Sequence, residues 1–425
     1  MLQIALIRQQ PDFVKERLLV KNFDASAAIN AILLLDEKRK TIQLELESSQ
    51  AGLNVISKEI GQMMARGEKI KAEEKKQEVT SLKEGLSPLQ EALDSADKQI
   101  MEILVSLPNL PAKDVPSGKT AEDNIVVREG GKKPSLPANA LAHWDLVRKY
   151  NMIDFELGNK ITGAGFPVYV NRGARLQRAL VQYFLDFNSA AGFVEYQPPL
   201  LVNEASAFGT GQLPDKEGQM YFVNEDELFL IPTSEVPLTN LWRDMILKEK
   251  DLPVKMTAFT PCFRREAGSY GKDVRGLNRL HQFDKVEIVQ IVHPGKSYTV
   301  LDEMVSHVEK LIQSLDLPYR ILRLCGGDMS FASAITYDFE VYSAAQQKWL
   351  EVSSVSNFES FQTNRMKIRF KDETGKSQLL HSLNGSSLAL PRILACLLEN
   401  HQEADHISLP ESLHFYFAGQ SVITA

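Results

Sequence analysis

The hydrophobic positions in the first hundred residues of this chain repeat with a period of 3.5. Between residues 28 and 66, alternating steps of three and four residues meet ten positions, and eight of them are apolar. A second series meets eight positions from Val79 to Ile103, all of them apolar. A 3.5 period sustained over this length predicts long helices that supercoil around each other. Because residues 65–69 (Ala-Arg-Gly-Glu-Lys) resemble a turn, we expect an antiparallel coiled-coil hairpin.

Two functions are open for this hairpin. A spacer or dimerisation rod is the simpler interpretation, and a lever that reaches a large partner is the sharper one. Around the expected turn, five basic residues oppose three acidic ones: Arg66, Lys69, Lys71, Lys75 and Lys76 against Glu68, Glu73 and Glu74. This bias favours contacts with phosphate groups, although a solvated helical face explains it nearly as well. Pro88 in the second arm predicts a kink, because proline removes a helical hydrogen bond.

The periodicity ends at residue 107, and the stretch that follows, to residue 137, is rich in proline and glycine. This composition indicates a linker. From about residue 141 onward, helical and strand-like segments are interleaved. The first clear helix covers residues 175–189, which place five apolar side chains on one helical face: Leu176, Leu180, Tyr183, Phe184 and Phe187. A short strand-like segment and two prolines follow this helix.

Four later segments place polar residues among apolar ones. In residues 228–237, Thr233 and Glu235 are two positions apart, so they would share one face of a strand. A solvent-exposed strand edge explains this segment slightly better when the segment is taken by itself.

Residues 257–291 predict a long hairpin, with its loop at Gly268, Gly271 and Gly276. Arg264 and Glu266 would share one face of the first strand. Phe283, Lys285 and Glu287 would share one face of the second. A nucleotide site needs such a set, because arginine binds phosphate with a fork of donors and an aromatic ring stacks on a base. Surface salt bridges explain each residue alone better than they explain the set.

Two further segments complete the polar set. Residues 351–354 (Glu-Val-Ser-Ser) close a strand that we expect to include Phe339, Val341 and Trp349, and a carboxylate with hydroxyls suits magnesium bound to phosphates. In residues 384–392, asparagine and serines before an apolar run predict a helix N-cap region, with proline in the first turn. Arg392 near the start of this buried helix needs a partner, either a bound phosphate or an internal carboxylate.

Composition and charge exclude several classes of protein. The formal net charge of −7 argues against a protein that coats nucleic acid through bulk charge. No run of apolar residues is long enough to predict a membrane span, and the first residues lack the basic region of a signal peptide. Three widely spaced cysteines predict neither disulfides nor a zinc site, so a reducing cytoplasm is expected. Three Gly-Lys-Ser/Thr triplets lack the earlier glycine of a P-loop.

Taken in order, these segments resemble the class II aminoacyl-tRNA synthetases, and along nearly the whole chain they resemble the seryl-tRNA synthetases. The resemblance is carried by the N-terminal hairpin and by NLPAKDVPSGKTAEDN, TGQLP, TSE, FRREAGSYGKDVRGLNRLHQFDKVE, EVSSVSN and LNGSS. It implies an α+β fold, in which a class II antiparallel sheet flanked by helices is joined to an N-terminal antiparallel coiled-coil arm. The implied domains are a tRNA-binding domain (residues 1–108), a linker (109–140) and a catalytic domain (141–425).

The resemblance also implies a reaction, the ATP-dependent attachment of L-serine to tRNA(Ser) through a seryl-adenylate, with Mg²⁺. The enzyme would be a cytoplasmic homodimer without membrane attachment, and residues 175–199 would lie at the dimer interface. The arm would hold the long variable arm of the tRNA, and selenocysteine tRNA, tRNA(Sec), stays open as a second substrate. Two rivals remain: a synthetase for another small amino acid, such as threonine or proline, and a synthetase-like binding protein without catalysis.

The family's residue roles are carried over to matching positions only. Arg264 would hold the α-phosphate and Arg392 would lie close to the γ-phosphate, both as catalytic residues. Glu266 would bind adenine, Phe283 would stack on it, and Glu351 with Ser354 would hold magnesium and phosphate oxygens. The ATP site would contain Arg264, Arg265, Glu266, Phe283, Glu351, Val352, Ser353, Ser354 and Arg392. The serine pocket would contain Thr233, Ser234, Glu235, Glu287, Asn384 and Ser386, with Glu287 on the hydroxyl. Three positions depart from the family pattern: Arg265, where serine is common, and Ser387 and Pro391, where glycine is common.

Overall fold

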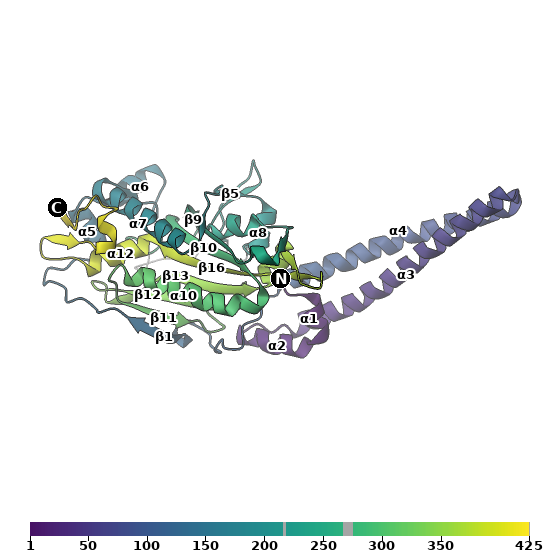
Figure 1. Ribbon diagram of the computed structural model, residues 1–425, viewed down its shortest axis with the longest axis horizontal. Helices are drawn as coiled ribbons and strands as arrows, with labels where there is room; N and C mark the ends of the chain where they lie inside the picture. The colour runs from purple at the N-terminus through teal and green to yellow at the C-terminus, as the bar shows by residue number, and fades with distance from the viewer. Residues whose placement is uncertain (216–217, 267–274, 425) are drawn as a thin grey trace. The chain divides into compact units, whose positions relative to one another are not determined.

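The computed structural model describes residues 1–215, 218–266 and 275–424 (Figure 1). Gly268 and Gly271, which the sequence places in the loop of the long hairpin, lie outside these residues. The chain forms two compact units. The helical unit comprises Leu2–Leu19 and Phe23–Pro108, and the body comprises Met1, Val20–Asn22 and Asn109–Ala425.

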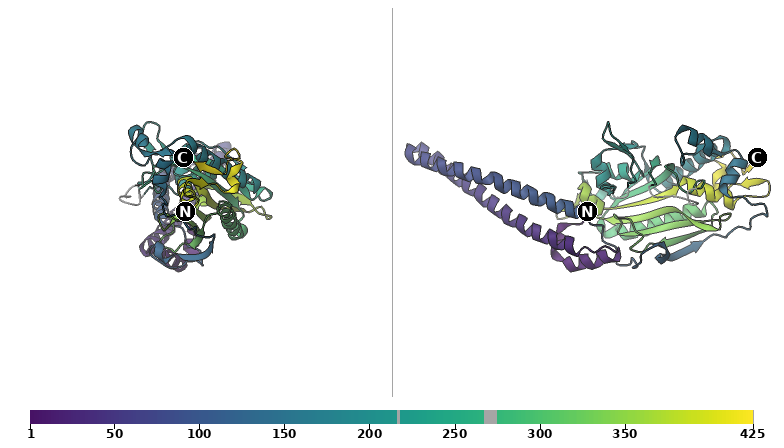
Figure 2. Two further views of the ribbon diagram at one scale, coloured as in Figure 1. Left: turned by 90° about the vertical axis from the view of Figure 1, so that its left-hand side faces the viewer. Right: turned by 180° about the vertical axis from the view of Figure 1, so that it is seen from behind.

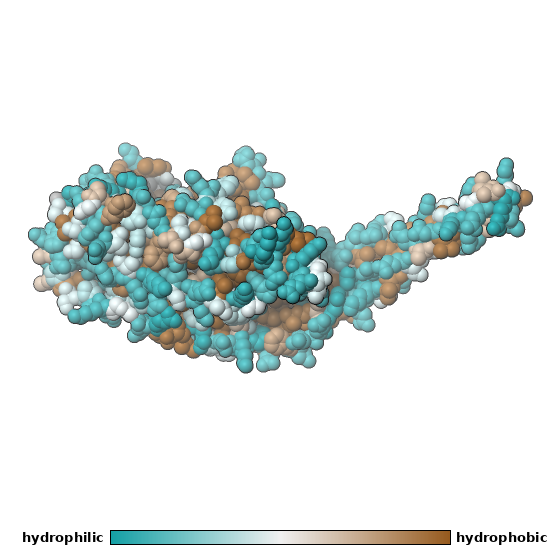
Figure 3. Space-filling view, viewed as in Figure 1, coloured by the Kyte–Doolittle hydropathy of each residue, from teal (hydrophilic) through white to brown (hydrophobic). Residues whose placement is uncertain are grey.

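The helical unit is built around two long helices that pair side by side, α3 (Ser26–Ala65) and α4 (Lys69–Ser106) (Figures 1 and 2). They confirm the antiparallel hairpin and its turn. At 1.5 Å per residue each helix is roughly 60 Å long. The face seen in Figure 3 is mostly hydrophilic, with apolar side chains scattered along it. Helix α4 continues through Pro88 as one element, and the kink stays a prediction. Two short helices precede the hairpin, α1 (Ile4–Gln9) and α2 (Pro11–Val20).

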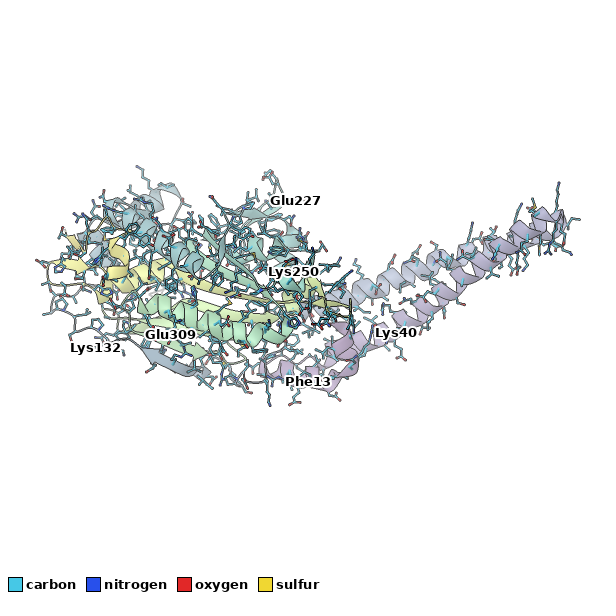
Figure 4. The ribbon with its side chains drawn as sticks, viewed as in Figure 1. Phe13, Lys40, Lys132, Glu227, Lys250 and Glu309 are labelled. Atoms are coloured by element: carbon cyan, nitrogen blue, oxygen red, sulfur yellow. The ribbon has the colours of Figure 1, made fainter. Side chains whose placement is uncertain are left out.

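The seam between the long helices is apolar except at one place. Its buried apolar residues include Ile32, Ile42, Leu53 and Ile56 on α3 and Ala72, Ala96 and Ile100 on α4. The exception is Asp36, whose side chain is 2% exposed and lies within ion-pair distance of Arg8, Arg39 and Lys40 (Lys40 is labelled in Figure 4). Arg39 also faces Asp97 of the other helix at 3.8 Å, so an ion cluster around one buried carboxylate replaces apolar contacts here.

The centre of the body is an eight-stranded sheet in the order β1-β11-β12-β13-β16-β10-β9-β4. All neighbouring strands are antiparallel except β4 and β9, which confirms the predicted antiparallel sheet. The strands are β1 (Ile125–Gly130), β4 (Val194–Glu195), β9 (Val254–Phe263), β10 (Gln282–Val292), β11 (Tyr319–Arg323), β12 (Ile335–Ser343), β13 (Lys348–Glu359) and β16 (His381–Ala389).

Helices cover one face of this sheet and form the main core with it. They include α5 (His143–Lys149), α7 (Asn171–Ala190), α10 (Ser297–Gln313) and α12 (Leu390–Asn400). Leu180, Met304 and Leu394 from three of these helices pack in one cluster with Ile288 and Val355 of the sheet. The predicted helix at residues 175–189 is confirmed, and Leu176, Leu180 and Phe184 are its fully buried apolar residues.

Shorter elements complete the body. The helices are α6 (Phe155–Ile161), α8 (Glu204–Thr210), α9 (Glu235–Asn240), α11 (Phe361–Met366), α13 (Glu411–His414) and the 3₁₀ turns Ala121–Asp123, Glu249–Asp251 and Pro294–Lys296. The strands are β2 (Ile153–Asp154), β3 (Val168–Tyr169), β5 (Leu201–Val202), β6 (Phe222–Val223), β7 (Leu228–Leu230), β8 (Ile246–Lys248), β14 (Arg369–Lys371), β15 (Ser377–Leu379), β17 (His406–Ser408) and β18 (Val422–Thr424).

The segment predicted as a linker, residues 109–140, contributes to the body. Its strand β1 pairs with β11 at the edge of the sheet. Arg128 of β1 pairs with Glu309 of α10, which is labelled in Figure 4. The buried Asn109 amide donates hydrogen bonds to the carbonyls of Ala332 and Phe358 at 2.9 and 2.8 Å. Proline and glycine therefore mark irregular backbone here, which is attached to the sheet. Among the described residues, no helix has the length and apolar character needed to cross a membrane.

Candidate active site

A cleft of about 670 Å³ opens on the face of the sheet opposite α7, α10 and α12. It brings together thirteen residues predicted from the sequence: Thr233, Glu235, Arg264, Glu266, Phe283, Glu287, Glu351, Val352, Ser353, Ser354, Asn384, Ser386 and Arg392. Two predicted residues are not in its lining as far as the structure describes the chain. Ser234 is fully buried before α9. The Arg265 guanidinium lies 5.6 Å from the ring centre of Tyr221.

One end of the cleft is closed by a buried polar cluster. The Lys285 ammonium donates to the Thr233 hydroxyl at 2.8 Å and lies 2.5 Å from the Glu287 carboxylate. Thr233 also donates to Glu287 at 3.3 Å. The second carboxylate oxygen of Glu287, Oε1, is buried and has no hydrogen-bond partner among the described residues, which leaves one acceptor for a ligand. Phe283, Lys285 and Glu287 all line the cleft from β10, as their alternation predicts.

Glu235 forms the second part of this end. The prediction that Thr233 and Glu235 share a strand is wrong, because β7 ends at Leu230 and Glu235 begins α9. The Glu235 carboxylate is 5% exposed and accepts a hydrogen bond from Gln362 at 2.6 Å. Burial raises the pKa of Glu235 to about 7, against the effect of the Gln362 bond.

The opposite end carries half-buried charged residues from the β9–β10 hairpin. Arg264 and Glu266 follow β9, which ends at Phe263, so they do not share a strand face as predicted. The Arg264 guanidinium lies 5.2 Å from the ring centre of Phe283 and donates to the carbonyl of Pro232 at 3.3 Å. Glu266 has a positive φ of 48° and accepts a hydrogen bond from Arg279 at 3.3 Å.

Two neighbouring strands supply carboxylates to this end. Residues 351–354 lie in β13, whereas Phe339 and Val341 lie in β12, so the single strand predicted there is two. Asp338 of β12 pairs in register with Ser354, and its Oδ1 is buried with no hydrogen-bond partner in the part of the chain that the structure describes. Burial, and next the charge of Glu351, raise the pKa of Asp338 well above its usual range.

Arg392 forms hydrogen bonds both with the carboxylate end of the cleft and with the β9–β10 hairpin. Asn384 and Ser386 lie in β16, so the predicted N-cap region is a strand, and α12 begins at Leu390 with proline in its first turn. Arg392 donates to the Glu351 carbonyl at 2.7 Å and to its carboxylate at 3.4 Å. It also donates to the carbonyl of Asn278 at 3.1 Å. Of the two partners predicted for Arg392, the internal carboxylate is therefore present. It is Glu351, and the side chains of both residues line the cleft.

The candidate set missed three cleft or supporting residues. Lys285 shares the strand face of Phe283 and Glu287, a signal that the sequence already contained. Asp338 alternates with apolar residues in β12, so the same alternation along a strand could have identified it. Gln362 is 127 residues from its partner Glu235, and no local pattern joins them. The cleft thus combines a closed polar pocket with an end suited to a polyanion that has a flat ring.

Comparisons with known proteins support this interpretation. Residues 221–401 match the class II core domain of tRNA synthetases (G, H, P, S and T), and residues 1–111 match the seryl-tRNA synthetase N-terminal domain. A serine–tRNA ligase of Salinibacter ruber is 47% identical over 418 residues, which are 98% of each chain. The chain belongs to the seryl-tRNA synthetase family. It is accordingly a class II serine–tRNA ligase, an enzyme that joins serine to tRNA with ATP.

Two solved structures show how completely this family shares the fold. The Pyrococcus horikoshii seryl-tRNA synthetase, a complex with ATP, matches with a TM-score of 0.92 at 32% identity, over 100% of this chain and 99% of that one. The Naegleria fowleri cytoplasmic serine–tRNA ligase, a complex with AMP, has a TM-score of 0.88 at 26% identity over the same shares. The predicted fold class and enzyme class are confirmed.

Proposed function

We propose that the polar pocket binds serine and the open end of the cleft binds ATP, so that the serine carboxylate meets the α-phosphate between them. The observation that carries this proposal is the placement of the Thr233–Lys285–Glu287 cluster and of Arg264 in one cleft. Glu235 and the free oxygen of Glu287 are acceptors for the ammonium and hydroxyl of serine. Asn384 and Ser386 complete this pocket from β16.

The open end then holds the nucleotide. Arg264 binds the α-phosphate, and the Phe283 ring beneath it stacks on adenine. Arg392 binds the γ-phosphate, and Glu266 contacts the adenine side. In the first step a serine carboxylate oxygen attacks the α-phosphorus and pyrophosphate leaves. In the second step the terminal ribose hydroxyl of the tRNA attacks the adenylate carbonyl, and AMP leaves. Catalysis comes from positioning and from charge stabilisation by the two arginines.

Glu351, Ser354 and the neighbouring Asp338 fit a magnesium ion. They offer only oxygen donors, and Oδ1 of Asp338 has no partner among the residues described by the structure. Magnesium is commonly held by one or two carboxylates together with substrate phosphates. When bound, the ion would neutralise part of the phosphate charge, and these side chains would fix its place beside Arg392.

The pocket also accounts for selection among small amino acids. Alanine lacks the hydroxyl and would leave the buried Glu287 oxygen unpaired, which is strongly disfavoured. Threonine adds a methyl group, and its exclusion is worth roughly 1–3 kcal/mol. Serine is therefore the amino acid that satisfies both the polar atoms and the volume.

We propose that the α3–α4 hairpin binds the long variable arm of tRNA(Ser). The match of residues 1–111 to the seryl-tRNA synthetase N-terminal domain supports this role, and so does the basic bias around the turn. Selenocysteine tRNA, tRNA(Sec), with its own long variable arm, stays open as a second substrate. Deletion of residues 30–104 should spare adenylate formation and remove tRNA charging, and normal charging by the shortened protein would contradict this role.

We further propose a homodimer that forms through α7 and the edge strand β4. Strand β4 has no second neighbour in the described sheet, and its Val194 side chain is 57% exposed. Ile161 of α6 is 75% exposed. An open strand edge and exposed apolar side chains each favour pairing with another chain. The three cysteines are free and buried, which agrees with a reducing compartment such as the cytoplasm.

ATP–pyrophosphate exchange on the purified protein tests the central proposal. It should require serine, and threonine, alanine and cysteine should support little exchange. Exchange with a different amino acid would retain the class II core and overturn the assignment of the pocket. Absence of exchange with all four would favour a synthetase-like binding protein.

A further inference from the structure

A fully buried histidine–glutamate pair lies behind the nucleotide end of the cleft. His143 is the first residue of α5 and Glu399 lies in the last turn of α12, and both side chains are 0% exposed. His143 Nδ1 lies 2.8 Å from Oε1 of Glu399, and the backbone N–H of His143 donates to the same oxygen at 2.9 Å. The other oxygen accepts a hydrogen bond from Ser343. Burial opposes the charged form of Glu399, but the bonds from His143 and Ser343 hold its pKa below the usual value.

The second ring nitrogen of His143, Nε2, forms a hydrogen bond with the backbone of the β9–β10 hairpin. The Leu277 N–H donates to Nε2 at 3.0 Å. Because a backbone N–H only donates, Nε2 must accept, and the imidazole proton must lie on Nδ1, which faces Glu399. Glu399 thus fixes the tautomer that Leu277 requires. The neighbouring Gly276 has a φ of +70°, and a Cβ there would lie 2.3 Å from Nε2, so glycine permits this approach.

A series of hydrogen bonds links Leu277 to the cleft. The carbonyl of the next residue, Asn278, accepts the hydrogen bond from Arg392 Nε. The Asn278 side-chain amide donates to Gln346 at 3.2 Å, and the Gln346 amide in turn donates to Glu399 at 3.1 Å. Arg392 and Glu399 belong to the same helix, so α12 holds the returning limb of the hairpin (residues 275–281) at two points. Residues 277–280 of this limb line the nucleotide end of the cleft.

We propose that His143 and Glu399 form a positioning pair that keeps residues 275–281 in the conformation that binds ATP. The proposal rests on the proposed function, since it assumes that this end of the cleft takes the nucleotide. Neither residue lines the cleft, so both act through the backbone at Leu277 and through Arg392. The serine pocket is built from other elements. Loss of the Leu277 contact should therefore raise KM for ATP by about five- to tenfold and leave KM for serine within about twofold.

Two substitutions of His143 separate its contact with Leu277 from its contact with Glu399. In His143→Gln the amide reaches the place of Nε2 and keeps an acceptor for Leu277. In His143→Asn the amide reaches only the place of Nδ1, so it keeps the contact to Glu399 and loses Leu277. KM for ATP in pyrophosphate exchange should stay near wild type in the first variant and rise in the second. His401→Gln is the matched control, because His401 follows the same helix and bonds the carbonyl of Leu315 at 3.0 Å.

Hydrogen–deuterium exchange at the Leu277 amide gives a readout that needs no ligand. The amide should exchange slowly in wild type and in His143→Gln, and faster in His143→Asn. If His143→Asn does not fold, Gly276→Ala crowds Nε2 and should give the same rise in KM for ATP. Equal KM values for ATP in the glutamine and asparagine variants, or an unchanged Leu277 exchange rate in the latter, would overturn the positioning role. Failure of the proposed function would show separately, as absence of serine-dependent exchange in wild type.

Discussion

The two ends of the cleft are built on different principles. At the serine end, Thr233, Lys285 and Glu287 are 5% exposed or less and bond one another. At the nucleotide end, the side chains of Arg392 and Glu351 are 30% and 49% exposed. A pocket whose polar groups are fixed in advance discriminates between small ligands, because a wrong ligand leaves buried atoms unpaired. Exposed charges instead attract and neutralise a flexible polyanion.

This difference separates the expected effects of mutation. A change at the serine end removes part of a buried ion cluster, so it should lower stability and selectivity together. A change at the nucleotide end removes a half-exposed charge, so it should lower the reaction rate and leave the fold almost intact. The variants below test that separation.

Arg264→Ala should have the largest effect on the reaction. Within the described residues, the Arg264 side chain donates one hydrogen bond, to the Pro232 carbonyl at 3.3 Å, and it lines the cleft. Loss of one donor to a developing charge typically costs about 10²–10³ in rate. Serine-dependent pyrophosphate exchange should fall by at least this factor, while the midpoint of thermal unfolding and the oligomeric state of the protein stay unchanged. Unchanged exchange would remove Arg264 from the phosphate site.

Glu287→Ala should lower stability most. It leaves the Lys285 ammonium buried without its carboxylate, and breaking a buried ion pair from one side costs about 3–5 kcal/mol. Urea unfolding measures this loss, with Glu351→Ala at the open end as the matched carboxylate control. The control should lose no more than about 1 kcal/mol. Similar losses for both variants would contradict the difference between the two ends.

Glu235→Gln tests the serine end through pH. The pKa of Glu235 is raised by burial from 4.5 to about 7, so the folded protein keeps this proton at pH values where the unfolded chain has lost it. Stability contributed by this group therefore falls as pH rises from 4.5 to 7, by up to about 3 kcal/mol, and is constant above. The glutamine variant lacks this fall. The difference in unfolding free energy between wild type and variant should change between pH 5 and 8, and parallel curves would exclude the shift.

Local patterns predicted some parts of this structure and not others, for physical reasons. The α3–α4 hairpin follows from its 3.5 period, and the cleft face of β10 follows from alternation at Phe283, Lys285 and Glu287. Both depend on residues close in sequence. The link between Glu235 and Gln362 is tertiary, and a single sequence contains no local trace of it.

Two errors show how tertiary pairing overrides local preference. Asparagine and serine favour helix caps, so residues 384–387 indicated a helix start. In the structure they form the middle of β16, which is paired on both sides, with β10 and β13. The segment around Glu235 alternates like a strand, yet α9 begins there with Pro237 in its first turn. Proline in a first helical turn was the available signal for that helix.

Arg265→Ser should have the smallest effect of these variants. It tests whether the nucleotide end of the cleft extends to the side chain of residue 265. The side chain lies over Tyr221 and outside the described lining of the cleft, although the sequence placed it in the ATP site. Loss of this cation–π contact costs about 0.5–1 kcal/mol of stability, and KM for ATP should stay within about twofold. Steady-state pyrophosphate exchange at varied ATP checks this, beside Arg264→Ala as its neighbour. A tenfold rise in KM would mean that Arg265 reaches the nucleotide, and that the open end includes the side chain which follows Arg264.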